Sequence, residues 1–95
     1  MFIVLLRFSD NKANAGQFME GHKAWLQRGF EDGVFLLAGS LQPNAGGGVL
    51  AYNTSLADLQ GRVDADPFVA EQVVTAEIHE IAPAKADARL DFLLG

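Results

Sequence analysis

The stretch from Ala15 to Asp32, AGQFMEGHKAWLQRGFED, contains the clearest structural signal in the sequence. At about 100° per residue, its apolar side chains fall on one arc of about 140°, and its charged and amide side chains lie opposite. The apolar arc holds Ala15, Phe18, Met19, Trp25, Leu26 and Phe30, and the polar side holds Glu20, Lys23, Gln27, Arg28 and Glu31. This pattern predicts an amphipathic helix that Gly33 terminates.

Four segments on either side of this helix have the composition of β-strands. Phe2–Phe8 and Val34–Ala38 are nearly continuous apolar runs, which are typical of strands buried on both faces. Residues 49–52 form a third, shorter run. Residues 73–81 alternate, so that one side carries Val74, Ala76 and Ile78 and the other Thr75, Glu77 and His79. We therefore expect four strands.

Two polar segments separate the remaining elements. Residues 43–48, PNAGGG, are dense in turn formers and predict a hairpin turn before the third strand. Residues 53–55, NTS, offer caps for a second helix whose inner face is Leu56, Leu59 and Val63. We expect Pro67 to end this helix.

The elements follow in the order β-α-β-β-α-β, which predicts a ferredoxin-like α+β fold with both helices on one face of a four-stranded antiparallel sheet. Residues 1–82 form this domain, and residues 83–95 form a weakly amphipathic tail. The other sheet face is left open although the first two strands are apolar throughout. We therefore expect a homodimer through the sheet face, with the tail packing on the partner.

The composition excludes several classes of protein. The chain has 95 residues, a formal charge of −5 and no cysteine. A disulfide scaffold, a thiolate zinc site and a cysteine nucleophile are excluded, and the net acidity argues against a nucleic-acid partner. No segment approaches the ~20 apolar residues of a membrane-spanning helix, and the first residues lack the features of a signal peptide. We expect a cytoplasmic protein without a membrane partner.

His22 is the most informative polar residue, because it lies within the apolar arc of the first helix. A histidine in this position is either a structural residue bonded to a backbone carbonyl or a general acid/base, since histidine changes charge near neutral pH. A carboxylate partner would favour the second interpretation, because it fixes the tautomer of the imidazole.

Asp66 is the candidate carboxylate, although an aspartate before a proline often serves only to terminate a helix. Trp25 and Phe68 belong either to the core or to the wall of a pocket. His79 shares a strand face with Glu77, but two such groups without a third ligand are weak evidence for a metal site. We expect an exposed or dimer-facing pair there, and no metal.

The chain resembles the YCII-related (YciI-like) domain family over most of residues 1–82. The resemblance rests on His22 and Trp25 in the first helix, on Leu37-Ala38-Gly39-Ser40, on the glycine-rich hairpin and on Asp66-Pro67-Phe68. It implies a dimeric α/β barrel of ferredoxin-like subunits with His22 and Asp66 as the candidate catalytic pair. Many relatives have proline at the position of Ser40, whose hydroxyl is here a candidate substrate ligand.

The resemblance also implies a chemistry. One related branch eliminates chloride from a chlorinated muconolactone, and the similar muconolactone isomerases shift protons, both without a metal or an organic cofactor. We therefore expect a cofactor-independent lyase, isomerase or dehalogenase-like enzyme that acts on a small organic acid or lactone, with His22 as the base and Asp66 stabilising the imidazolium. Candidate substrate-binding residues are Arg7, Trp25, Ser40 and Phe68. For Arg7, a position at the solvent-exposed end of its strand is the alternative.

A second hypothesis is a non-catalytic dimeric module that binds a small ligand or a partner and keeps His22 for packing. A pocket beside His22 favours the enzyme, and a filled site favours the module. In the ideal topology, Asp66 lies near the far end of the second helix, about 15 Å along the axis from His22. Contact then requires a tilted or shortened helix, an inward loop, or the second subunit.

Overall fold

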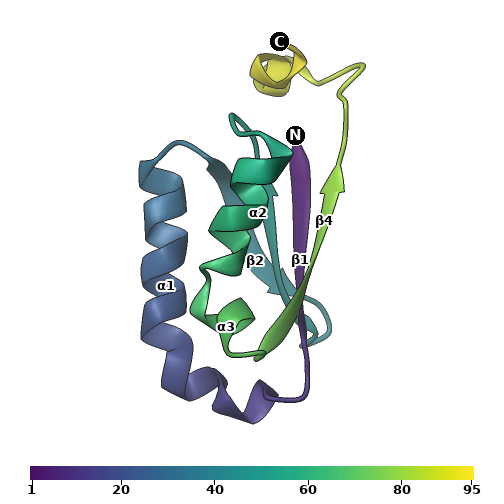
Figure 1. Cartoon of the computed structure of the whole chain (residues 1–95). Coiled ribbons are helices and arrows are strands. Elements are labelled where there is room, and N and C mark those ends of the chain that lie inside the picture. The colour runs from purple at the N-terminus through teal and green to yellow at the C-terminus, as the bar shows by residue number, and fades with distance from the viewer.

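The computed structural model describes residues 1–95, in which a four-stranded sheet is covered on one face by helices (Figure 1). The strands are β1 (Phe2–Phe8), β2 (Phe35–Leu41), β3 (Gly46–Ala51) and β4 (Val74–Glu80). Their order in the sheet is β2-β3-β1-β4, and each neighbouring pair is antiparallel. The predicted ferredoxin-like α+β arrangement is therefore confirmed.

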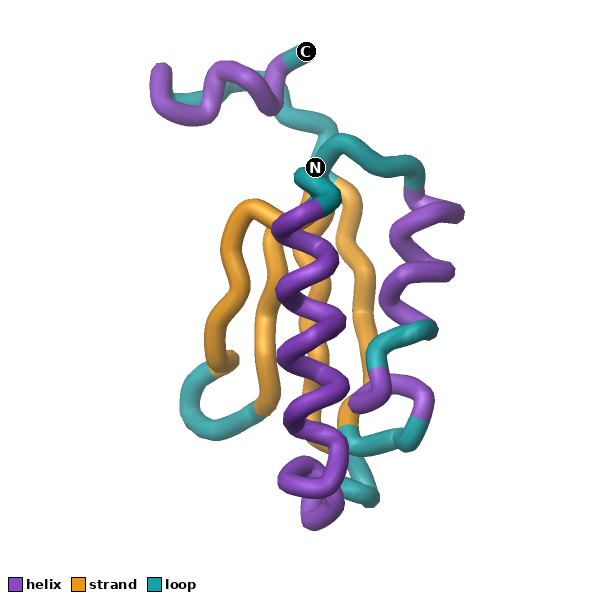
Figure 2. Tube along the Cα trace, turned by 90° about the vertical axis from the view of Figure 1, so that its left-hand side faces the viewer, coloured by secondary structure: helices purple, strands orange, loops and turns teal.

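The helical layer consists of α1 (Ala15–Glu31), α2 (Leu56–Asp64) and the one-turn helix α3 (Pro67–Ala70). The view in Figure 2 has α1 in front of the strands and α2 and α3 beside it. Two 3-10 segments, η1 (Lys12–Asn14) and η2 (Ala88–Leu94), complete the chain. None of these helices combines the length and the apolar character needed to cross a membrane.

The core lies between the sheet and the helices. Its buried apolar side chains are Phe2, Val4, Leu6, Trp25, Val34, Phe35, Val49, Ala51, Leu59, Val63, Phe68, Val73 and Val74. Along β1 the buried residues alternate with half-buried Ile3 and Leu5, because side chains of a strand point to opposite faces in turn. Burial of β1 on both faces, as the sequence predicted, is therefore not found within the single chain.

The three consecutive glycines lie inside β3 and not in the hairpin turn, which corrects the sequence-based expectation. Gly46, Gly47 and Gly48 pair with β1 on one side and β2 on the other, and the turn falls at residues 42–45. At Gly46 the backbone has a φ of 134°, and an added Cβ would lie 1.8 Å from the carbonyl oxygen of Leu6. Glycine is required there by close packing of backbones, and β2 extends to Leu41 to pair with the glycine segment.

Pro67 begins a helix, although the sequence analysis expected it to end one. The preceding helix α2 stops at Asp64, and Asp66 caps α3 with Pro67 in its first turn. Proline suits that position because the first helical N–H groups have no intrahelical acceptor.

Two further expectations need qualification. Phe30, placed on the apolar arc of α1, is 42% exposed, while the sheet-facing position is taken by Gly29 against the ring of Phe35. The tail, expected to pack on a partner, forms η2, and its Phe92 contacts Tyr52 of the same chain edge to face, with 5.2 Å between ring centroids.

Candidate active site

His22 and Trp25 lie on the apolar stripe of α1, so their side chains point from the helix toward the sheet. Trp25 is 2% exposed and its indole Nε1–H donates a 2.8 Å hydrogen bond to the carbonyl of Arg62. His22 lies one turn closer to the start of the helix, and 15% of its side chain is accessible. The imidazole is therefore at the boundary between the core and an open space.

Asp66 is fully buried at the junction between α2 and α3. Its Oδ1 accepts a 3.0 Å hydrogen bond from the backbone N–H of Phe68, the usual interaction of an N-cap residue. The other oxygen, Oδ2, is buried and has no hydrogen-bond partner in the protein. The carboxylate is thus held rigidly while half of its capacity to accept hydrogen bonds goes unused.

The same Oδ1 atom lies 2.9 Å from Nδ1 of His22. A carboxylate oxygen only accepts hydrogen bonds, so this contact favours the tautomer with the proton on Nδ1 and a free lone pair on Nε2. The 15 Å separation inferred from ideal helices does not arise, because α2 ends at Asp64 and the chain turns inward at Asp66.

Two aromatic rings fix the plane of the imidazole. The ring of Phe68 stacks on His22 with 4.1 Å between centroids and an angle of 4°, and Trp25 lies 5.8 Å away at 25°. The stack and the hydrogen bond to Asp66 together leave the ring little freedom to rotate.

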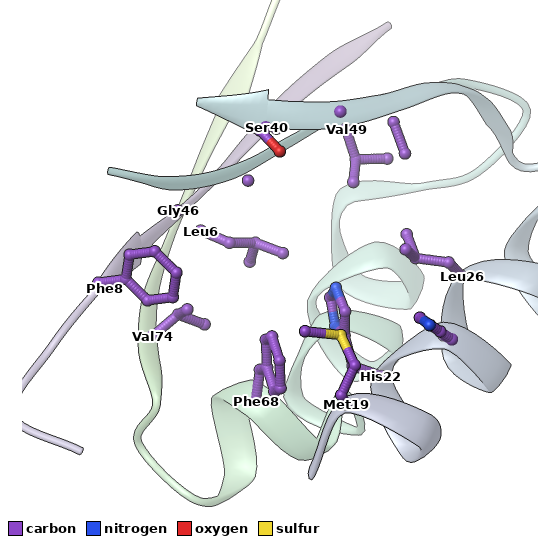
Figure 3. Close-up of a pocket in the computed structure, with 15 residues that line it drawn as sticks. Leu6, Phe8, Met19, His22, Leu26, Ser40, Gly46, Val49, Phe68 and Val74 are labelled. Carbon is purple, nitrogen blue, oxygen red and sulfur yellow. The ribbon is translucent and has the colours of Figure 1, made fainter. Parts of the chain in front are cut away.

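A cavity of about 340 Å³ opens beside His22 (Figure 3). This volume falls within the usual range of small-ligand sites. Its apolar lining is Leu6, Phe8, Met19, Leu26, Ala38, Val49, Phe68 and Val74. Ser40 on β2 points across the cavity toward the wall that carries Met19 and His22. The Ser40 hydroxyl forms no hydrogen bond within the protein, so it is available to a ligand.

The structure brings four of the six predicted site residues together. His22, Ser40 and Phe68 line the cavity, and Asp66 lies directly behind His22. Trp25 lies outside the lining, with its ring centroid 5.8 Å from that of the imidazole.

Arg7 does not join the site. Neighbouring residues of β1 point to opposite faces, and Leu6 is the one that lines the cavity, so Arg7 is on the open face of the sheet. There its Nε donates a 2.8 Å hydrogen bond to Glu77. The alternative placement of Arg7, at the solvent-exposed end of its strand, agrees with this geometry, in which 48% of its side chain is exposed.

The pair of Glu77 and His79 also lies on the open face. A hydrogen bond from His79, followed by the guanidinium of Arg7, lowers the pKa of Glu77 from its ordinary value. No group of three or more potential metal ligands occurs in the chain.

Sequence reasoning missed Lys23 and the glycine strip as parts of the cavity wall. The helical pattern predicts Lys23 on the polar side of α1. Its position next to His22 is the signal that points to the cavity, since adjacent residues are only about 100° apart on a helix. The glycines gave a composition signal that points equally well to a turn.

No protein-family model matches the sequence, and a search of curated proteins found no similar sequence. Among solved structures, the fold is similar to that of 5-chloro-2-hydroxyhydroquinone dehydrochlorinase from Burkholderia phenoliruptrix, determined in complex with 2,5-dihydroxybenzoquinone. The TM-score is 0.67 at 13% sequence identity, and the match covers 85% of this chain and 93% of that chain. At this identity the similarity shows the fold alone, which is the α+β arrangement with a four-stranded antiparallel sheet.

Proposed function

We propose that the chain is a YciI-like, cofactor-independent proton-transfer enzyme of the lyase, isomerase or dehalogenase type, acting on a small organic acid or lactone. The observation that carries this proposal is the 2.9 Å contact between His22 Nδ1 and the fully buried Asp66, at the edge of a ligand-sized cavity. A buried carboxylate behind a partly accessible imidazole is an arrangement suited to general base catalysis.

The proposed reaction begins when the Nε2 lone pair of His22 removes a proton from a carbon next to a carbonyl group. The electrons of the broken C–H bond then form an enolate, and Asp66 stabilises the imidazolium by charge. Return of the proton to another carbon completes an isomerisation. Expulsion of a leaving group such as chloride from the neighbouring carbon completes an elimination, and the imidazolium then releases its proton to solvent.

The cavity favours this enzyme over the non-catalytic module, for which we expected a filled site. Apolar side chains surround the imidazole on several sides, so a bound ligand would exclude most of the water. Such exclusion strengthens the electrostatic interaction between a charged imidazole and Asp66.

The experiment is a search for His22-dependent proton exchange. Lactones, small carboxylic acids and hydroxyquinones are incubated with the protein in D2O, and incorporation of deuterium or release of halide is followed by NMR and ion-selective detection. The hydroxyquinones are included because the structural neighbour was solved with 2,5-dihydroxybenzoquinone. We expect His22→Gln to lower the rate by about 10²–10⁴-fold.

The matched control is His79→Gln, because His79 is the other histidine, is exposed and lies on the opposite face of the sheet. Equal loss of activity in both variants, or turnover that persists in His22→Gln, would refute the catalytic assignment. A protein that binds these compounds at His22 without any exchange would be the ligand-binding module.

We also propose that the working unit is a homodimer formed through the open sheet face. The register places Ile3 of β1, Leu50 of β3 and Leu37 of β2 in one row on this face, and Leu37 is 56% exposed. The next row contains Gly48 between Leu5 and Gly39, and the two glycines make this part of the face flat. This apolar area, which is bordered on β4 by Glu77 and His79, suits self-association. The exposed Leu90, Phe92 and Leu94 of the tail offer the partner additional apolar contacts.

Sedimentation equilibrium at micromolar concentration tests the dimer. We expect a mass of two chains for the wild type and of one chain for Leu37→Glu, because the substitution buries a charge in the interface. Leu56→Glu is the control, since Leu56 is 48% exposed on α2, outside the sheet face. A wild-type protein that sediments as a single chain would contradict this proposal.

A further inference from the structure

The charge of the cavity is opposite to that of the whole protein. The chain contains 12 acidic and 7 basic side chains, yet no aspartate or glutamate is among the residues that line the cavity. Lys23 is the only lining residue with a permanent charge at neutral pH, and Asp66 is hidden behind His22 with no accessible surface. The lining therefore presents one cationic side chain and no carboxylate to a ligand, which favours an anionic group placed close to Lys23.

Lys23 is free of intramolecular ion pairs. The arginines that form such pairs are Arg7 with Glu77, Arg62 with Asp32, and Arg89 with Asp87. On the same helix, the Gln27 side chain donates a hydrogen bond to Glu31 and makes none with Lys23. The ammonium group is therefore available to an external anion without loss of an existing interaction.

A second cation lies near the same cavity. The Lys12 ammonium is 4.8 Å from the centre of the Phe8 ring, and Phe8 belongs to the lining. The Lys12 ammonium already makes a cation–π interaction with the Phe8 ring, whereas Lys23 has no such contact. Lys23 is thus the stronger candidate for direct contact with a ligand.

The shape of the cavity further restricts the ligand. Leu6, Val49 and Val74 extend from the sheet on one side, and Phe68 and Met19 face them from the helical side. Gly47 opposes Leu6 in the sheet and adds no side chain, so this part of the wall is formed by backbone. These surfaces suit a small planar, conjugated molecule better than a branched one.

We propose that the substrate is a small planar anion and that Lys23 binds its carboxylate or ring oxyanion while His22 acts on a neighbouring C–H group. The inference rests on the proposed function in taking this cavity as the substrate site. The anionic group is present before and during the reaction, so Lys23 contributes mainly to binding and His22 to the rate of the chemical step.

The test compares benzoate with its neutral analogue benzamide. Dissociation constants are measured by NMR from the amide shifts of Gly46, Gly47 and Gly48, which report binding in this cavity. We expect the wild type to bind benzoate about tenfold more tightly than benzamide, which corresponds to about 1.4 kcal/mol. In Lys23→Met the preference should disappear through weaker benzoate binding, and in Lys23→Arg it should return.

Lys85→Met is the matched control, because it removes the same charge from an exposed position outside the cavity. It should keep the wild-type preference. The proposal is overturned if neither probe shifts the cavity amides, if benzamide binds as tightly as benzoate, or if Lys23→Met retains the preference.

The outcomes also separate this inference from the proposed function. A Lys23-dependent preference for benzoate in a protein without proton-transfer activity would refute the enzyme and keep the anion site. Turnover that requires His22 and has the same KM in Lys23→Met would keep the enzyme and refute the anion site.

Discussion

The substitution Asp66→Asn tests the catalytic pair with the smallest change in shape. It removes the negative charge behind His22 and keeps an oxygen that can still accept the hydrogen bond from the Phe68 N–H, which is 3.0 Å away. The introduced amide also brings two N–H donors into a place where Oδ2 is buried without a partner. One change therefore affects both the tautomer of His22 and the stability of the fold.

The structure allows both effects to be estimated. A hydrogen bond to a charged group contributes about 1.5–3 kcal/mol, so about 2 kcal/mol favours the Nδ1–H tautomer by about 30-fold. A buried donor without an acceptor costs about 1–3 kcal/mol. For a domain of this size, that cost lowers Tm by roughly 5–15 °C. We expect Asp66→Asn to lose most of the tautomer preference, to melt earlier, and to be catalytically impaired.

The assay is the ¹⁵N chemical shift of the two His22 ring nitrogens, recorded at about pH 9, above the ordinary range of histidine ionisation. The wild type should show a protonated Nδ1 and an unprotonated Nε2. Asp64→Asn is the control, because Asp64 is exposed and bonded only to Gln60. If the wild type has the proton on Nε2, or if Asp66→Asn leaves the shifts unchanged, the reasoning about the pair is wrong.

Three further variants probe the packing, the cavity and the open face. Gly29→Ala should destabilise the protein by about 1–3 kcal/mol in chemical denaturation, because the added Cβ would lie 2.1 Å from the Phe35 ring. The control Gly61→Ala, with nothing within 4 Å of the added Cβ, should stabilise the protein by about 0.5–1 kcal/mol. Equal changes in stability for the two variants would contradict this account. Ser40→Leu should abolish ligand binding at an unchanged Tm, since the larger side chain fills the cavity; binding measured by NMR at wild-type affinity would show that the ligand sits elsewhere. Hydrogen bonds from His79 and then from Arg7 lower the pKa of Glu77 from its ordinary value of 4.5. The ionised carboxylate therefore stabilises the folded state above pH 4.5, and this stabilisation is lost as the pH falls through the lowered pKa. Glu77→Gln should therefore show a shallower fall of Tm between about pH 5 and pH 3 at low salt, and identical slopes would refute this contribution.

The order of the elements could be predicted from the sequence because each element carries its own periodicity. The apolar stripe of α1 and the alternation along β4 both arise from burial on one side, and the structure places those residues as expected except for the exposed Phe30. The Ser55 cap was also readable, since its side chain accepts the N–H of Asp58 at the start of α2.

The arrangement of the site depends on features that no local pattern encodes. Asp66 reaches His22 because α2 is only nine residues long and the chain begins a new helix at Pro67. A proline after an aspartate is compatible with both the end and the start of a helix. The prediction that Pro67 ends a helix is therefore wrong, because Pro67 begins α3. Likewise, a run of glycines fits a turn as well as a strand, and only the closeness of the Leu6 backbone to Gly46 decides between them.

The packing of Asp66 itself argues for a chemical role. The cap on α3 requires only one oxygen, which a serine or an asparagine supplies without a charge. A buried carboxylate with one unpaired oxygen is costly, and a neutral imidazole offsets only part of that cost. In the proposed mechanism His22 accepts a proton from the substrate, and Asp66 then lies beside a cation. A buried carboxylate that gains a charged partner during the proposed reaction is the arrangement expected of a general base with its supporting carboxylate.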